Sequence, residues 1–506
     1  MRRRLAFALL AAVLLLAAAA WAVPAAVESA LSRQGFTWSH RSGTRWHDLR
    51  REGISAESLT LTLSPTPGAV LSGVNIEIDD LRSPSTTTSA EVSTPPRSLP
   101  LHFWAEDLAV SWQGDELASG LSGELWPELS LGSTDSAISR DASGWSVQLR
   151  RPLEVGPLSG EALLTVTGDT RLQLDLSIPG AVVTHPVLAD GPLPAQPLVA
   201  ALVWDRTSGA LSGEVSLGDV TVSVDGMLST SSLSLTADLS ADAIPLDAII
   251  ALFGRHIPEA RRADIRGSVG LQASISGPPA VWSAEVTAER LAAGGVIGSL
   301  SQLKYGPFTW RAPAADQGEV LRQTGEGHRS WTPLRDGMLL AHAAIAAEDA
   351  RFLSHPGYDI EGINAALAEL SAGAERPRGG STITQQLAKN LFLDGERTIA
   401  RKLRELLLSL ELERVLGKPR ILELYINVVE FGPTLYGVRA AADAYFIKQP
   451  AGLAPQEAAF LAAILPSPRS WYARLVRGAR PPEASVDRIL QNMVNTGALD
   501  AELSRW

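Results

Sequence analysis

The chain has 506 residues, 44 Lys and Arg side chains, 55 Asp and Glu side chains, and no cysteine. At this length it can build hydrophobic cores without disulfides. The formal net charge of -11 belongs to residues 1–304, because residues 305–506 hold 23 basic and 23 acidic side chains. One basic stretch, residues 376–420 with ten basic and five acidic side chains, is too small and too mixed for nucleic-acid binding.

The N-terminus is predicted to be a membrane anchor. Three arginines precede nineteen apolar residues, Leu5 to Val23, which are enough to cross a bilayer as a helix. The arginines predict that the tip is cytoplasmic and that the rest is periplasmic, so residues 1–29 would make this a single-pass protein of the cytoplasmic (inner) membrane. A cleaved signal peptide is the alternative, because Ala20-Trp21-Ala22 resembles a cleavage site.

Residues 30–304 are predicted to be a β-rich extracytoplasmic region. Apolar residues alternate there with Ser, Thr, Asp or Glu, and a period of two indicates half-buried antiparallel strands. Clear examples are Leu172/Leu174/Leu176/Ile178 and Leu233/Leu235/Ala237/Leu239. Residues 83–100, rich in Ser, Thr and Pro, indicate a linker, so the region holds one or two subdomains. A single helix is expected, at 244–260.

A membrane segment followed by many short amphipathic strands is weakly similar to the AsmA-like proteins, whose strands form a trough with a lipid-accommodating inner face. No diagnostic motif accompanies this similarity. A pair of ordinary β-sandwich or stacked-sheet domains that act as a spacer fits the same pattern. Residues 30–300 show no catalytic constellation, because their histidines are scattered and no cluster has metal-ligand spacing.

From Tyr305 onward the pattern becomes helical. Apolar residues recur at helical spacing, which predicts an all-α domain over 305–480 and a helical tail over 481–506. The predicted helices cover residues 337–350, 360–372, 382–392, 396–416, 418–428, 437–445 and 455–465.

Two carboxylates in this domain have contrasting surroundings. Glu348 ends the apolar run 338–347, and partial burial of a carboxylate raises its pKa toward the range of a general base. Glu405 lies on a helix with three arginines predicted on the same flank, because residues three or four apart share a helix face. These are Arg397, Arg401 and Arg404. Glu405 is therefore expected to stay ionised, with an ordinary solvated ion pair as the alternative.

A polar block, Gly379 to Gln386, lies between the two carboxylates. Its hydroxyl and amide side chains would each need a partner if they were buried, so the block is typical of a ligand-binding loop. It leads into a helix that Ser381 or Thr382 could cap. Three of the five lysines of the chain lie in the basic stretch around it, at Lys389, Lys402 and Lys418. Cations beside hydroxyls and a carboxylate suit a diphosphate.

Four blocks, 348–359, 379–390, 401–405 and 418–427, resemble in order and spacing the peptidoglycan glycosyltransferases, family 51 of the glycosyltransferases. The resemblance covers residues 331–472. One departure is Ile447, which stands where the family usually has glycine in Tyr-Phe-Gly-Lys. That departure puts the local turn in doubt, but not the site.

The resemblance implies a lysozyme-like α fold that polymerises lipid II into glycan strands, with inversion at the anomeric carbon and release of undecaprenyl diphosphate. It makes Glu348 the catalytic base, and Glu405 the residue that assists departure of the diphosphate. Glu405 would act directly or through a divalent metal, Mg or Mn; no cofactor is required and no protein metal site is expected. The implied substrate-binding residues are Asp349, Ser381, Thr382, Gln385, Gln386, Lys389, Asn390, Arg397 and Arg404.

The expected partners are lipid II, the growing glycan strand, the bilayer, and a separate transpeptidase or other cell-wall proteins, with no nucleic acid. Ser301-Gln-Leu-Lys304 matches a transpeptidase pattern but has no companion motif, so it is read as chance. Two alternatives remain. One is an inactive glycosyltransferase-like scaffold, which predicts loss of a catalytic glutamate. The other is a lipid-handling or tethering envelope protein with an accessory glycosyltransferase-like domain.

Overall fold

The computed structural model describes most of the chain from His40 to Asp500. The described ranges are 40–42, 45–51, 54–62, 68–76, 104–112, 115–124, 129–132, 136–141 and 144–500, the last with gaps at 230–233, 278–279, 299, 314–317, 375–378, 394–395 and 397. The predicted anchor at 1–29, the linker near 83–100 and residues 501–506 of the tail lie outside these ranges. Among the helices of the described ranges, none is both long and apolar enough to cross a bilayer.

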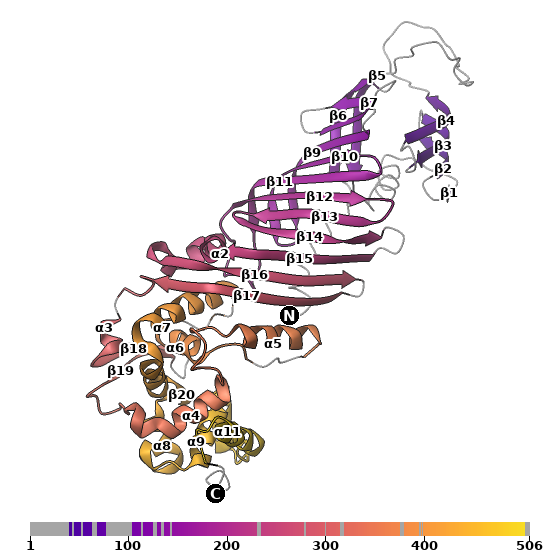
Figure 1. Cartoon of the computed structure of the whole chain (residues 1–506). Coiled ribbons are helices and arrows are strands. Elements are labelled where there is room, and N and C mark those ends of the chain that lie inside the picture. Colours follow the sequence, from indigo (N-terminus) through magenta and orange to yellow (C-terminus); the bar gives the residue numbers. More distant parts are fainter. Residues whose placement is uncertain are drawn as a thin grey trace. The chain divides into compact units, whose positions relative to one another are not determined.

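Antiparallel strands make up the N-terminal half of the described chain (Figure 1). A four-stranded sheet has the order β1-β2-β3-β4, and a 13-stranded sheet runs in sequence order from β5 to β17. The strands of the first sheet are β1 (His40–Ser42), β2 (Arg45–Arg51), β3 (Ile54–Thr62) and β4 (Gly68–Ile76). Those of the second are β5 (Trp104–Trp112), β6 (Asp115–Glu124), β7 (Leu129–Gly132), β8 (Ser136–Asp141), β9 (Gly144–Val155), β10 (Leu158–Gly168), β11 (Arg171–Val183), β12 (Gln196–Asp205), β13 (Ala210–Leu217), β14 (Val220–Ser229), β15 (Ser234–Pro245), β16 (Asp264–Gly277) and β17 (Val281–Gly294).

The predicted alternation of apolar and polar residues is confirmed in the larger sheet. Leu174 of β11 lies opposite Leu202 of β12, and the two side chains are only 4% and 1% exposed. Burial of each leucine stabilises the fold by about 1.5–3 kcal/mol. Because β5 to β17 belong to one sheet, the alternative of a pair of separate sandwich domains does not fit these strands. The lipid-accommodating trough stays a prediction.

The predicted helix at 244–260 is confirmed in its first half. α2 (Leu246–Phe253) ends at Gly254, whose φ of 44° leaves the helical region. Two 3₁₀ turns follow, η1 (Gly254–His256) and η2 (Pro258–Arg262). Pro258 cannot continue the backbone hydrogen bonding of a helix, which explains the break.

The chain forms two compact units. The first contains the described residues up to Thr184 together with 195–241 and 273–282; the second contains 185–194, 242–272 and the residues from Ser283 onward. The second unit therefore includes segments that precede Tyr305, where the sequence predicts the start of the helical domain.

All seven predicted helices of the second unit are present. They lie in α4 to α9. After β17 the elements of this unit follow in the order α3 (Ser301–Lys304), β18 (Pro307–Pro313), β19 (Glu319–Gly325), η3 (Leu334–Gly337), α4 (Met338–Glu348), α5 (Ile360–Ser371), α6 (Ile383–Phe392), α7 (Ile399–Val428), β20 (Glu430–Gly432), β21 (Leu435–Tyr436), α8 (Val438–Phe446), η4 (Pro450–Gly452), α9 (Pro455–Ile464), α10 (Pro468–Val476) and α11 (Glu483–Asn495). Two predicted helices lie in α7, on either side of a kink at Gly417, where φ is 72°.

The prediction of a purely α-helical domain is wrong in one respect, because this unit also contains two small antiparallel hairpins, β18–β19 and β20–β21. In β18 the side chains of Phe308, Trp310 and Ala312 alternate into the core and are buried. The same core contains fully buried alanines of α4 and α9, whose small size permits close packing of helices. Polar residues of α4, α6 and α7 meet next to this core, where Glu348 of α4 bonds to Gln386 of α6 and Gln386 bonds to Tyr425 of α7.

Candidate active site

Glu348 lies at the end of α4, and its carboxylate is oriented by Gln386 of α6, which is itself bonded to Tyr425 of α7. Glu348 Oε2 accepts a hydrogen bond from Gln386 Nε2 at 2.9 Å, and Gln386 Oε1 accepts one from the hydroxyl of the fully buried Tyr425 at 3.0 Å. Burial raises the pKa of the Glu348 carboxyl; the Gln386 hydrogen bond and the charge of Lys389 oppose the shift, and Asp349 adds to it. The predicted desolvated carboxylate is therefore confirmed.

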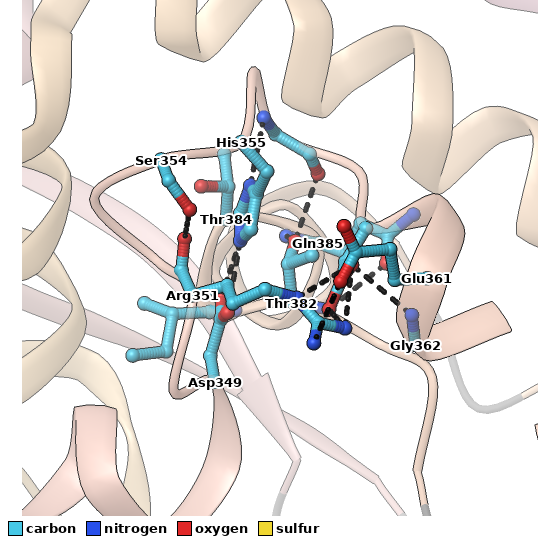
Figure 2. A network of polar contacts seen from close by, with 12 residues as sticks. Asp349, Arg351, Ser354, His355, Glu361, Gly362, Thr382, Thr384 and Gln385 are labelled. Atoms are coloured by element: carbon cyan, nitrogen blue, oxygen red, sulfur yellow. Dashed lines mark hydrogen bonds and ion pairs between the residues drawn. The ribbon is translucent and has the colours of Figure 1, made fainter. Parts of the chain in front are cut away.

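Asp349 anchors the loop that follows Glu348 (Figure 2). Its carboxylate accepts from His355 Nε2 at 2.8 Å and from the backbone N–H of Ile383, the first residue of α6, at 2.8 Å. Because Gly357 N donates to His355 Nδ1, the imidazole carries its proton on Nε2, facing the carboxylate. Asp349 is 6% exposed, and its hydrogen bonds hold the backbone next to Glu348, whereas its direct contact with substrate stays a prediction.

Thr382 caps α6 and is one of the two candidates, with Ser381, that the sequence predicts. Its hydroxyl oxygen accepts from Gln385 N at 3.1 Å, and Gln385 Oε1 accepts from Thr382 N at 3.0 Å, which is a reciprocal capping box. The Thr382 hydroxyl also donates to the Gly357 carbonyl at 2.8 Å. Both side chains are therefore engaged in holding the loop, and their direct contact with substrate stays a prediction.

Glu405 is 2% exposed and lies between two cations of the same helix. Arg401 Nη2 donates to its Oε1 at 2.9 Å, and Lys402 Nζ donates to its Oε2 at 2.7 Å. Lys402 Nζ also donates to Ser381 Oγ at 2.8 Å, which connects the start of α7 to the polar loop. The arrangement balances the Glu405 charge and brings Ser381 into the same cluster.

Lys389 of α6 is influenced by both carboxylates. Burial by the surrounding protein lowers the pKa of its ammonium group, the charges of Lys402 and Arg401 also lower it, and Glu405 and Glu348 raise it. The residue nevertheless keeps an exposed surface. Among the described residues no hydrogen bond or ion pair holds this ammonium, so it is available to an anionic ligand.

The other predicted cations and amides are placed differently. Arg404, predicted on the Glu405 flank, instead directs its guanidinium to Glu259, with Nε at 2.9 Å from each carboxylate oxygen and Nη2 at 2.6 Å from Oε1. A role of Arg404 at the diphosphate stays a prediction. Asn390 is half-buried on α6. Arg397 lies outside the described residues.

The sequence analysis placed Arg401 on the flank of Glu405, where it is a direct partner, but it missed Lys402 in the same role. The spacing of three residues between Lys402 and Glu405 is the signal that could have identified it. It also missed Glu413, which accepts hydrogen bonds from Thr384 and from Lys418 and so joins α6 to the middle of α7. In the described part of the chain, no group of three His, Cys, Asp or Glu could hold a metal ion.

Comparison with known proteins identifies the helical part. A family model described as Transglycosylase matches residues 317–494. The chain is 44% identical to a biosynthetic peptidoglycan transglycosylase of Thiobacillus denitrificans over 171 residues, 34% of this chain and 70% of the relative. A protein of that name from Rhodopseudomonas palustris is 44% identical over 179 residues, 35% of this chain and 76% of the relative. The chain belongs to the peptidoglycan transglycosylase family. A third relative, from Nitrosomonas eutropha, is 49% identical over 146 residues, 28% of this chain and 60% of the relative.

As a peptidoglycan transglycosylase, the protein is a glycosyltransferase that polymerises glycan strands in the cell envelope. Glu348 and Glu405 both lie within the matched residues, so the loss of a catalytic glutamate that an inactive scaffold predicts is not found. The segments 185–194, 242–272 and 283–294 of the helical unit lie outside the match.

Proposed function

We propose that this transglycosylase polymerises lipid II, with Glu348 as the general base for the acceptor. The observation that carries the proposal is the environment of Glu348, whose pKa is raised by burial and whose orientation is set by Gln386. A carboxylate with a raised pKa takes a proton more readily near neutral pH than an ordinary one. Glu348 therefore removes the proton of the sugar hydroxyl as that hydroxyl attacks the anomeric carbon.

The donor is the growing strand, held through its undecaprenyl diphosphate. Lys389 has an ammonium that no described residue pairs with, and Arg401 and Lys402 stand beside it. Preorganised cations stabilise charge as it develops on a leaving group. Lys389 thus contacts the diphosphate, and Glu405 keeps Arg401 and Lys402 in place for the same leaving group.

Inversion at the anomeric carbon is part of the proposal. Attack by the activated hydroxyl on one face, and departure of an α-linked diphosphate from the other, give a β linkage with inversion. Both Glu405 oxygens already accept from Arg401 and Lys402, so the residues present fit cationic assistance better than a Mg or Mn ion bound to Glu405. We therefore assign charge neutralisation to the basic side chains of the chain itself.

The substrate also accounts for the expected topology. Lipid II keeps its tail in the bilayer, so we propose that the N-terminal segment is an uncleaved anchor and that the catalytic unit lies on the periplasmic side. N-terminal sequencing of the mature protein tests this proposal. A first residue near Val23 or Ala25 would show that the segment is a signal peptide.

Incubation of the purified full-length protein with labelled lipid II tests the proposed reaction. We expect labelled glycan polymer and released undecaprenyl diphosphate. Lipid II that remains monomeric under conditions in which the protein is folded would contradict the proposal.

A further inference from the structure

The first turn of α7, which leads to Glu405, is bonded by a loop distant in the sequence. The carbonyl of Val187 accepts from Ile399 N at 2.8 Å, and that of Leu188 accepts from Ala400 N at 2.9 Å. The first N–H groups of a helix have no partner within the helix, so these carbonyls satisfy two of them. The start of α7 is therefore fixed by the connection between β11 and β12.

One turn further along α7, Arg404 forms the two-pronged ion pair with Glu259 of η2. The two side chains are 19% and 15% exposed, so the pair is mostly buried. Contacts through both Nε and Nη2 restrain the direction of the guanidinium as well as its charge. Arg404 immediately precedes Glu405 in the chain, so a restraint on one restrains the backbone of the other.

Two further side chains, one on α7 and one on α5, bond to the last strand of the large sheet or to the residues just after it. Glu411 of α7 accepts from Gly295 N at 3.1 Å and from Ile297 N at 2.6 Å. The Asn364 side chain of α5 accepts from Val286 N and donates to Val286 O, each at 2.9 Å, as a neighbouring strand would. All three partner residues, Val286, Gly295 and Ile297, lie in β17 or within three residues after its end.

These supporting segments share one property. The β11–β12 loop, η2 and β17 all lie outside residues 317–494, which the Transglycosylase model matches, whereas their partners on α5 and α7 lie inside. The part of the chain beyond the family match therefore supplies fixed contacts to the helix that carries Glu405.

We propose that Glu259 is a positioning residue for glycan polymerisation: by holding Arg404, it sets the placement of the first two turns of α7 and thereby of the Glu405 cluster. The inference rests on the function proposed above for Glu405. A misplacement of about 1 Å at a reacting centre can lower a rate on the order of a hundredfold. Glu259 bonds to Arg404, which immediately precedes Glu405, so we expect the loss of Glu259 to act through the backbone of α7 and to lower turnover more than substrate binding.

Steady-state kinetics of full-length Glu259→Gln with labelled lipid II test the proposal. The amide preserves shape and removes the charge that holds Arg404. We expect kcat to fall about ten- to a hundredfold, with KM for lipid II changed by less than about threefold. Glu289→Gln, the same change at an exposed position of β17, is the matched control and should keep wild-type kinetics. A kcat of Glu259→Gln within about twofold of wild type would overturn the proposal.

A variant with the two charges exchanged distinguishes loss of this ion pair from a general folding defect. In the double variant Glu259→Arg with Arg404→Glu, the ion pair is restored with opposite polarity. We expect it to restore slow amide exchange at residues 399–405, a readout that does not require Arg404 as a substrate-binding residue. A double variant that is folded by circular dichroism, yet exchanges there as fast as Glu259→Gln, would count against positioning by this pair.

Amide hydrogen exchange of residues 399–405 provides a readout that needs no activity. Glu259→Gln is expected to speed exchange there by about tenfold, because local opening becomes easier. Unchanged exchange would contradict the proposal. If wild-type protein fails to polymerise lipid II, the proposed function fails, while the exchange result still decides whether Glu259 positions α7.

Discussion

The Gln386 side chain joins Glu348 to Tyr425, accepting from the tyrosine hydroxyl at 3.0 Å and donating to the carboxylate at 2.9 Å. An ionised carboxylate can only accept, so Glu348 requires the amide nitrogen on its side, and the hydroxyl of the fully buried Tyr425 donates to the amide oxygen on the other. The amide nitrogen then points at Glu348. A residue predicted to bind substrate is thus observed to orient the proposed base.

Tyr425→Phe is predicted to weaken this orientation. The lost hydrogen bond is worth about 0.5–1.5 kcal/mol, which corresponds to a roughly two- to thirteenfold lower kcat if the whole loss falls on the transition state. The Gln386 hydrogen bond lowers the pKa of Glu348, so a loosened amide should move the acidic limb of the rate profile to higher pH. A pH series of kcat/KM measures both effects. Tyr305→Phe, at a position 75% exposed, is the control, and identical profiles for the two variants would refute the role of Tyr425.

The pH dependence of the wild-type reaction follows from the raised pKa of Glu348. A general base works only when deprotonated, so polymerisation should decline as the pH falls through the pKa of Glu348. That pKa lies above the ordinary value of 4.5, because burial disfavours the charged form. Initial rates from acidic to neutral pH should therefore show a limb with its midpoint above 4.5. A limb at or below that value would contradict the assigned environment.

Glu348→Gln should also change stability, with a defined sign. Since the folded pKa exceeds the unfolded one, the native state binds more protons between the two values, and the native carboxyl destabilises the fold increasingly as pH rises through this window. Above it, the glutamine variant should be at least as stable as wild type. The difference should shrink below about pH 4.5, where both states are protonated. Thermal melts at neutral and acidic pH test this sign, and a variant clearly less stable at neutral pH would contradict it.

Lys389→Ala should weaken the binding of a phosphoglycolipid donor mimic such as moenomycin. Removal of a charge-assisted contact costs about 1.5–3 kcal/mol, which is roughly ten- to a hundredfold in affinity. Lys389→Arg should rescue only partly, because a planar guanidinium does not occupy the place of a compact ammonium. Binding titrations measure these changes.

The control for Lys389 is Arg414→Ala, which removes a cation of α7 that is already paired with Glu411. It should change affinity little. Equal small losses for the two alanine variants would indicate a diffuse effect of surface charge, and the diphosphate site would then lie elsewhere.

The helices were predictable because their signals are local. The apolar period of α4 to α9 and the cap at Thr382 need only neighbouring residues. The hairpin of β18 and β19 was missed because its alternation, Phe308, Trp310 and Ala312, spans one short strand beside strong helical patterns. The single large sheet was not distinguishable from two sandwiches, since both give a period of two.

In the site, the sequence predicted the surroundings of the two glutamates better than the contacts between segments. The burial of Glu348 and the cations beside Glu405 follow from apolar and charged neighbours along the chain. The ion pair of Arg404 and Glu259 joins residues 145 positions apart, and no local pattern reveals it. Helix geometry alone assigned Arg404 to the flank of Glu405, although a partner from another segment determines where its guanidinium points.

Polymerisation of labelled lipid II by wild type and Glu348→Gln tests the account most directly. The amide keeps the shape and cannot accept the proton, so the rate should fall on the order of a hundredfold to ten-thousandfold while the fold is retained. Glu483→Gln, the same change at an exposed position of α11, should leave the rate unaltered. A folded Glu348→Gln variant that polymerises lipid II at nearly the wild-type rate would contradict the assignment of Glu348 as the catalytic base.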